Sequence, residues 1–177
     1  ESTDPEIIPD TISNGSIIKV YYVKDNFDYT VEYYYDGNID NSKTETITAT
    51  YQDVITTYTD KNITGYRLDR TENLPLTVSE VESNNVIKVF YVKDNFDYTV
   101  EYYYDGAIDS SKTETINATY QDVISTYTDK NITGYRLDRT ENLPLTVSED
   151  AENNVIKVFY VKDNFDYTVE YYYDETF

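Results

Sequence analysis

The sequence contains no cysteine, histidine, methionine or tryptophan. The absence of cysteine excludes disulfide bonds and thiolate zinc sites, so the fold has to be stabilised by packing or by another kind of crosslink. The absence of both cysteine and histidine also excludes Ser-His and Cys-His nucleophiles and removes the commonest general base. Paired carboxylates are the catalytic chemistry that remains, and no pair stands out by its spacing. We therefore expect no enzymatic activity.

Positive charge is scarce, with 14 lysine and arginine residues against 34 aspartate and glutamate residues and a net charge of −20. Such a chain is repelled by phosphate backbones and anionic lipids, so binding to nucleic acid or to a membrane surface is disfavoured. Long apolar runs are absent too, since no stretch reaches the roughly 18 apolar residues of a membrane-spanning helix. We expect a monomer, with no membrane insertion within this fragment.

One stretch, VIKVFYVKDNFDYTVEYYYD at Val86–Asp105, organises the chain because it occurs three times. It recurs with small changes at Ile17–Asp36 and unchanged at Val155–Asp174. The period is 69 residues, and residues 26–94 align with 95–163 without a gap and with seven differences. A unit of this length can form a small domain with its own core. We predict four parts: the end of a divergent preceding unit (1–25), repeat 1 (26–94), repeat 2 (95–163), and the first strand of an incomplete third unit (164–177), which frays or pairs with a neighbour.

Each repeat begins and ends with residues typical of β-strands. Alternation over residues 29–36 predicts a strand whose core face carries Tyr29, Val31, Tyr33 and Tyr35. A threonine-rich strand over residues 44–51 follows an Asp36-Gly37 loop and completes a hairpin. The last strand, residues 86–92, is apolar on both faces apart from Lys88, as expected of a strand inside a sheet.

Between these strands we expect a short helix. Asp53 is a candidate N-cap, and Val54, Ile55 and Tyr58 fall on one side of a helix that ends before Gly65, although the intervening threonines are poor helix formers. The resulting order predicts a β-rich α+β fold in which a sheet packs on one helix. The segment between repeats, Lys93–Asp97, is short, so neighbouring units either continue into one another as an elongated rod or meet at a hairpin turn.

Four segments in this order resemble the mucin-binding-protein (MucBP) repeat family of Gram-positive surface proteins: VEYYYDG, TETITATYQD, ITGYRLDRTENLP and VIKVFYVKD. The chain is similar, more loosely, to the B-type repeats of internalins. The resemblance implies tandem β-grasp (ubiquitin-like) domains, each with the order strand, strand, short helix, strand, strand. It also implies an extracellular protein anchored to the cell wall through signals outside this fragment. In one departure, Gln52-Asp53 replaces the glycine that is common in the family between the second strand and the helix.

The resemblance also implies a function. It points to a repeat region of a cell-surface adhesin that binds mucin or another host glycoprotein or glycan. The alternative is a passive stalk that projects a separate N-terminal binding head from the cell wall. Repeats that differ at only seven positions are compatible with this alternative, because copy number then sets the reach of the stalk.

The 22 tyrosines are the most unusual feature of the composition. Tyrosine offers rigid amphipathic surface, which suits stacking on glycans or contact with a protein. On the core face we assign tyrosines to packing, namely Tyr33 and Tyr35 with their counterparts Tyr102 and Tyr104. On the opposite face, Tyr34 and Tyr103 are equally compatible with packing and with a binding surface. They are the candidate ligand-binding residues.

Two further hypotheses concern acidic loops and isolated lysines. Four aspartates near the linker and the first hairpin are candidate calcium ligands, against the simpler interpretation of solvated loops: Asp25, Asp28, Asp36 and Asp40. No other cofactor is expected. Lys88 and Lys157, alone among apolar strand neighbours, are candidates for an isopeptide crosslink. The simpler interpretation is that the stem of each lysine packs on the sheet while its charged end stays in water.

Overall fold

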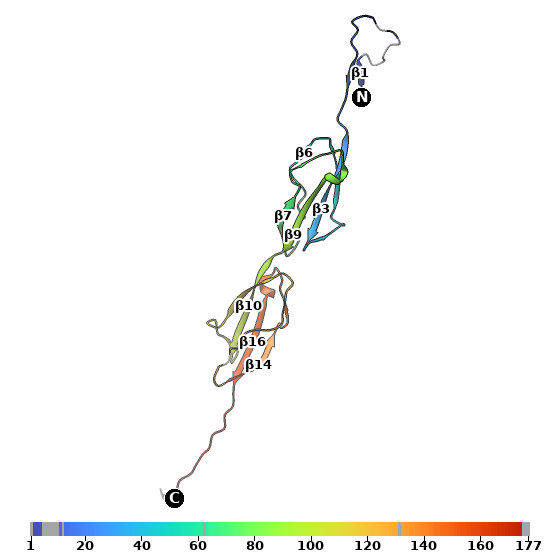
Figure 1. Cartoon of the computed structure of the whole chain (residues 1–177). Coiled ribbons are helices and arrows are strands. Elements are labelled where there is room, and N and C mark those ends of the chain that lie inside the picture. Colours follow the sequence, from blue (N-terminus) through green and yellow to red (C-terminus); the bar gives the residue numbers. More distant parts are fainter. Residues whose placement is uncertain (1, 5–10, 12, 62, 131, 175–177) are drawn as a thin grey trace. The chain divides into compact units, whose positions relative to one another are not determined.

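The computed structural model describes the chain except residues 1, 5–10, 12, 62, 131 and 175–177 (Figure 1). Two compact units divide it. The first comprises Glu1–Asn62 and Arg67–Val92, and the second comprises Ile63–Tyr66 and Lys93–Phe177. The short stretch Ile63–Tyr66 therefore belongs to the second unit although it precedes the last strands of the first repeat.

The first repeat folds around a five-stranded sheet in which β4, β3, β9 and β7 follow one another and β5 also pairs with β3. β3 runs antiparallel to β5 and parallel to β9, so the first and last strands of the repeat lie side by side (Figure 1). A separate two-stranded ribbon joins β6 and β8. The elements are β3 (Asn26–Tyr35), β4 (Asn38–Ile39), β5 (Glu45–Thr50), β6 (Val54–Ile55), β7 (Tyr66–Glu72), β8 (Leu76–Thr77), the 3-10 turn η1 (Glu82–Asn84) and β9 (Val86–Lys93).

The predicted alternation of the first strand is confirmed. Val31 and Tyr33 are fully buried and Tyr29 is 8% exposed, whereas Thr30 and Glu32 point to the other face and are half-buried. Burial of a large apolar side chain contributes about 1.5–3 kcal/mol, so these three residues hold β3 on the core. The predicted hairpin with β5 is also confirmed, since Tyr29 lies opposite Ile47.

The predicted helix after Asp53 is wrong, and with it the expectation of a helix-containing α+β or β-grasp unit. Residues 54–55 form β6 instead, and the described residues between Thr56 and Thr64 follow an irregular path. In the described part of the chain, the helical elements are two 3-10 turns of three residues each. The fold that replaces the expectation is nearly all β-structure.

Two causes explain this outcome. The β-branched Thr56 and Thr57 lose side-chain freedom in a helix, which favours the extended alternative. Tyrosine hydroxyls then satisfy backbone groups that a helix would have paired internally. Tyr33 donates to the Thr59 carbonyl oxygen at 2.6 Å, and the Lys61 N–H donates to the Tyr91 hydroxyl at 3.2 Å. The segment is thus tied to the core without a helix.

The second repeat reproduces the first at an offset of 69 residues. β10 lies parallel to β16 and antiparallel to β12, and the core consists of residues such as Val100, Tyr102, Ile156 and Val158. Its elements are β10 (Asn95–Tyr104), β11 (Ala107–Ile108), β12 (Glu114–Thr119), β13 (Val123–Ile124), β14 (Tyr135–Glu141), β15 (Leu145–Thr146), the 3-10 turn η2 (Ala151–Asn153) and β16 (Val155–Lys162).

The two end segments differ from the repeats. In the first, β1 (Ser2–Asp4) pairs antiparallel with β2 (Lys19–Tyr21). At the other end, Asn164–Asp174 is exposed along its whole length and has no strand within it, while residues 175–177 of the predicted incomplete unit lie outside the described residues. None of the described helical elements is long and apolar enough to cross a membrane.

Candidate functional site

The outward face of the first sheet carries a stack of rings. Alternation along β3 and β9 turns Tyr34 and Phe90 to the same side, and the parallel register places them directly opposite each other. Their ring centroids are 4.7 Å apart with an interplanar angle of 22°, a stacked arrangement. Such pairs contribute about 0.5–1.5 kcal/mol beyond the area that they bury.

β7 extends the stack with a cation. The Arg70 guanidinium carbon lies 3.9 Å from the centroid of the Phe90 ring, within the range of a cation–π contact. Two carboxylates hold the guanidinium in place, Asp69 at 2.8 Å and Glu72 at 3.1 Å. Tyr34, Phe90 and Arg70 together form what we call the outer ladder.

The phenol of Tyr34 is held by a charge. Its hydroxyl donates to Glu32 Oε2 at 2.6 Å. This hydrogen bond, together with desolvation and the negative charge of Glu32, raises the pKa of Tyr34 to about 12. Lys88 Nζ lies 5.8 Å from the centre of the Tyr34 ring. The ladder at neutral pH therefore presents a protonated phenol flanked by one carboxylate and one ammonium group.

The second repeat carries the same ladder. Tyr103 and Phe159 stack at 4.7 Å and 20°, and the Arg139 guanidinium carbon lies 3.7 Å from the centre of the Phe159 ring. The Tyr103 hydroxyl donates to Glu101 at 2.7 Å, which raises the pKa of Tyr103. Tyr34 and Tyr103 are half-buried, since one ring face is covered by the neighbouring strand.

The tyrosines assigned to the core lie on the opposite face. Tyr33 and Tyr102 are fully buried, as predicted, and each hydroxyl also reaches a glutamate, Glu45 or Glu114. Burial raises the pKa of Tyr33 well above its ordinary value. Tyr35 and Tyr104 are half-buried and stack on the last strand of their repeat, at 5.2 Å from Tyr91 and 5.1 Å from Tyr160.

The four candidate calcium ligands do not come together. Asp40 is bound by Lys43 at 2.6 Å and by Ser42, and these hydrogen bonds lower the pKa of Asp40 to about 2. Asp28 accepts a hydrogen bond from Thr48 at 2.6 Å, Asp25 lines a hollow at the end of β3, and Asp36 lies in a tight turn. Within the described residues, no group of three or more carboxylates is arranged to hold a metal ion.

The two candidate crosslinking lysines lie on the outward face. Lys88 and Lys157 are half-buried, and each lies opposite a glutamate of the first strand, Glu32 or Glu101. A different lysine is tied to the core. Lys61 pairs with Glu45 beside the Tyr33 ring, as Lys130 pairs with Glu114 in the second repeat. Sequence alone gave no signal for this pair because Lys61 lies in the irregular segment and Glu45 lies in β5, 16 residues earlier in the chain.

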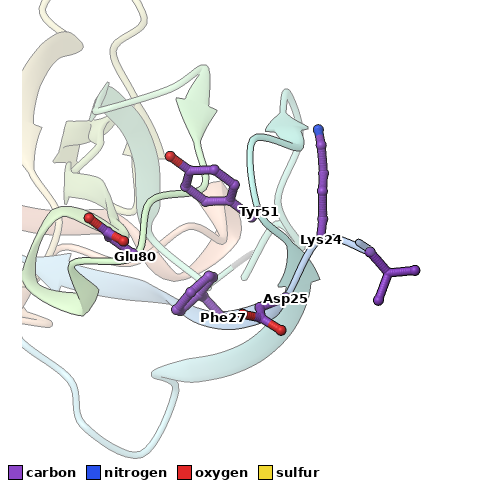
Figure 2. A pocket seen from close by; sticks show the side chains of 6 residues that line it. Lys24, Asp25, Phe27, Tyr51 and Glu80 are labelled. Atoms are coloured by element: carbon purple, nitrogen blue, oxygen red, sulfur yellow. The ribbon is translucent and has the colours of Figure 1, made fainter. Parts of the chain in front are cut away.

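A hollow of about 250 Å³ opens at the end of β3 in the first unit. Figure 2 shows the Tyr51 and Phe27 rings among the residues that line it, with the side chains of Glu80, Asp25 and Lys24 around them. The two rings meet edge to face, with centroids 6.0 Å apart. Sequence analysis did not single out these residues, since they become neighbours through the β3–β5 pairing and the loop after β8.

Comparison with known protein families and with curated proteins gives no match for this chain. The description of the chain therefore rests on its structure. The chain consists of tandem repeats of nearly all β-structure, each with an aromatic stack on the outward face of its sheet.

Proposed function

We propose that these repeats belong to an extracellular surface protein and bind a host glycoprotein such as mucin through the outer ladder. The observation that carries the proposal is the recurrence of one partly exposed aromatic stack, at the same spacing, in both repeats. The resemblance of four sequence segments to mucin-binding repeats supports the same class of ligand. Absence of cysteine suits an exported bacterial protein.

The surroundings of the ladder favour a neutral sugar over an anionic one. Beside the Tyr34 ring lies Ile39, its cross-strand neighbour, whose side chain is 40% exposed. An apolar sugar face can pack on such a surface, while Glu32 and Lys88 can pair with hydroxyl groups. Three carboxylates surround two cations at each ladder, and the net charge of −20 repels sialic acid or sulfate.

Because the chain carries two ladders, each ladder needs only a weak affinity for the ligand. A single shallow site on a sheet face binds weakly, because little of a ligand is removed from water there. A multivalent glycoprotein can engage both copies, and linking raises the overall affinity by about 10²–10⁴ without a new contact. We therefore expect detectable binding to immobilised mucin and little binding to a free monosaccharide.

The test is binding of the chain to immobilised mucin, compared with its Tyr34→Ala/Tyr103→Ala double variant. The matched control is Tyr172→Ala, because Tyr172 occupies the same place in the third copy of the strand sequence but lies outside a sheet and is 61% exposed. The proposal expects saturable binding that the double variant loses and the control keeps. Equal binding by the folded double variant would show that the ladder is not the site.

A second candidate, a spacer that holds a separate binding head, is favoured by a specific observation. The polar groups of the ladder are already engaged within the chain: Arg70 with Asp69 and Glu72, and the Tyr34 hydroxyl with Glu32. A stack that is satisfied internally stabilises a sheet without needing a ligand. Absence of mucin binding by the folded chain, with and without calcium, would favour this spacer function.

A further inference from the structure

The first and last strands of each repeat lie side by side and run in the same direction. Residues 30–35 of β3 pair with residues 86–91 of β9, and β10 pairs with β16 in the corresponding register (Figure 1). The chain enters each repeat at the beginning of β3 or β10, the entry strands, and leaves it at the end of β9 or β16, the exit strands. Because the two strands of a pair are parallel, entry and exit lie at opposite ends of that pair.

This geometry decides how a sheet responds when the chain is pulled from both sides. The pull acts on the entry strand at its beginning and on the exit strand at its end, so it slides the two strands past each other along their length. Hydrogen bonds between parallel strands are evenly spaced, and a force along the strands loads all of them at once. In a hairpin pulled at its open end, by contrast, the bonds are loaded and broken one after another. The parallel pair therefore resists tension better than a hairpin with as many hydrogen bonds.

Further hydrogen bonds extend the pair at both of its ends. At the beginning of the pair, the Thr30 N–H donates to the main-chain carbonyl oxygen of Asn85 at 2.8 Å. At its end, the Asp36 N–H donates to the main-chain carbonyl oxygen of Tyr91 at 3.1 Å. The Asn85 side chain adds a bond to the Asp28 carbonyl oxygen at 3.1 Å. The second repeat has the same three bonds, at 2.8, 3.1 and 3.2 Å, so the extension belongs to the repeat.

Aromatic rings connect the same two strands on both faces of the sheet. In the outer ladder, Tyr34 stacks on Phe90, which lies directly opposite in the register. On the other face, Tyr35 stacks on Tyr91, again its direct neighbour, with ring centroids 5.2 Å apart. A slide by one residue would turn the buried Tyr33 to the outward face, and a slide by two residues would separate both ring pairs. The rings thus oppose the motion that a pull along the chain would cause.

The repeats follow one another along the chain with little slack. β9 ends at Lys93 and β10 begins at Asn95, so a single residue, Asp94, joins the exit strand of one repeat to the entry strand of the next. Tension in the chain passes through this residue directly into the next parallel pair. The sequence contains no cysteine, so no disulfide relieves the strands of the load. Two parallel pairs are thus connected in series along the chain.

We propose that each repeat is a load-bearing module, in which the entry and exit strands, with the rings stacked between them, withstand tension along the chain by shear. A chain held at one side and pulled at the other keeps its repeats folded, and so keeps its reach, under a force that peels an antiparallel pair apart. This function goes beyond ligand binding. It does not depend on a ligand at the outer ladder, so this proposal and the glycoprotein proposal can fail separately.

The first test is single-molecule force spectroscopy of the whole chain in two pulling geometries. Because the chain lacks cysteine, cysteines introduced at exposed positions provide unique attachment points. Asn95→Cys with Asn164→Cys pulls the second repeat at its entry and just beyond its exit, whereas Asn95→Cys with Asn117→Cys pulls the antiparallel β10–β12 pair near its open end. The first geometry should need a several-fold higher unfolding force. Equal forces in the two geometries, or a lower force in the first, would overturn the proposal.

The second test concerns the rings between the two strands. Phe159→Leu removes the ring that stacks on Tyr103 between β10 and β16. Phe96→Leu is the matched control, because Phe96 is also half-buried and also meets a tyrosine ring, Tyr120, but lies before the stretch of β10 that pairs with β16. Relative to its loss of equilibrium stability in chemical denaturation, Phe159→Leu should lower the unfolding force between residues 95 and 164 more than Phe96→Leu does. Proportionate losses in both variants would refute the proposal as stated.

The third test loads both repeats together. Lys24→Cys with Asn164→Cys applies the force on either side of the two repeats, at exposed positions. The proposal predicts two unfolding events at similarly high force, each releasing a length of chain close to one period of 69 residues. An event at the low force of the β10–β12 geometry would show that one of the repeats does not bear load, which contradicts the proposal.

Discussion

The same sequence, NFDYTVEYYY, forms a strand in two places and remains extended and exposed in a third. In β3 and β10, its first tyrosine is 8% exposed, and its valine and second tyrosine are fully buried. At residues 164–173, the corresponding Tyr167, Val169 and Tyr171 are 86%, 55% and 79% exposed. Identical local propensity thus gives different structure, and neighbouring strands decide between the two outcomes.

Two strands and one buried side chain hold β3 in place. β5 and β9 flank β3, and the buried Asn85 forms hydrogen bonds with its first half, a contact that we call the asparagine clamp. The side-chain amide of Asn85 donates a hydrogen bond to the main-chain carbonyl oxygen of Asp28 at 3.1 Å. The main-chain carbonyl oxygen of Asn85 accepts one from the Thr30 N–H at 2.8 Å. Asn154 repeats both bonds on β10.

The largest expected effect on stability comes from replacing the valine of this repeated sequence. Val100→Asp places a charge in a fully buried position and should unfold the second unit, at a cost of more than about 4 kcal/mol. Val169→Asp changes the same residue in the same sequence, but in the exposed copy, and should leave the free energy of unfolding of the monomer unchanged. Chemical denaturation followed by circular dichroism measures both. Similar losses in the two variants would contradict the different environments.

The asparagine clamp should give the next effect. Asn154→Ala removes the hydrogen bonds of the buried Asn154 side chain to backbone groups of Ser148 and Asp97 and leaves those groups unpaired, so we expect a loss of about 1–3 kcal/mol in the second unit. The neighbouring Asn153 is exposed, and Asn153→Ala should cost little. A stability of Asn154→Ala within error of Asn153→Ala would show that the clamp does not hold β10.

Gly65 and its counterpart Gly134 occupy the same turn of the two repeats but differ in their surroundings. Gly65→Ala and Gly134→Ala share the strain of a positive φ, about 1 kcal/mol. Gly65→Ala also drives a Cβ into the Tyr120 ring and should cost about 1–3 kcal/mol more. Thermal unfolding of the two variants gives the difference directly. Equal melting temperatures would mean that the Gly65 contact is not closely packed in solution.

The smallest expected effect is a change in the pKa of the Tyr34 hydroxyl. The pKa of Tyr34, about 12, exceeds the value of about 10 for a free phenol, so the folded state keeps its proton longer than the unfolded state. The stabilisation is therefore complete below pH 10 and is lost as the pH rises through about 12. Glu32→Gln should lower the pKa of Tyr34, as followed by NMR of the ring carbons. Glu170→Gln, which alters the partner of Tyr172, should leave it unchanged.

Part of the fold could be predicted because it is local. Alternation predicts that β3 and β5 pair, and the Asp36-Gly37 pair predicts the reversal of the chain after β3. Both turn residues have positive φ, 49° and 80°, although the turn joins β3 to the short strand β4 and β5 follows after a further loop. The segment after Asp53 was mispredicted because its backbone is satisfied by the hydroxyls of Tyr33 and Tyr91, which come from distant strands. A local pattern cannot report such bonds.

Only part of the candidate site could be predicted from the sequence. Alternation placed Tyr34 on the outward face, but its stacking on Phe90 depends on the parallel register of β3 with β9, which a single sequence does not encode locally. Arg70 joins the ladder through a third strand. The Tyr51 hollow was missed for the same reason, since its walls combine β3, the end of β5 and a distant loop.

The measurement that tests the account most directly is amide hydrogen exchange at Thr30, Thr99 and Thr168. The three threonines have the same neighbours in sequence, so their intrinsic exchange rates are equal. The Thr30 and Thr99 amides donate to Asn85 and Asn154 at 2.8 Å and should be strongly protected, whereas Thr168 should exchange at the rate of an unfolded peptide in the monomer. Equal protection of all three in a dilute monomer would contradict the claim that neighbours, and not the sequence itself, make this strand.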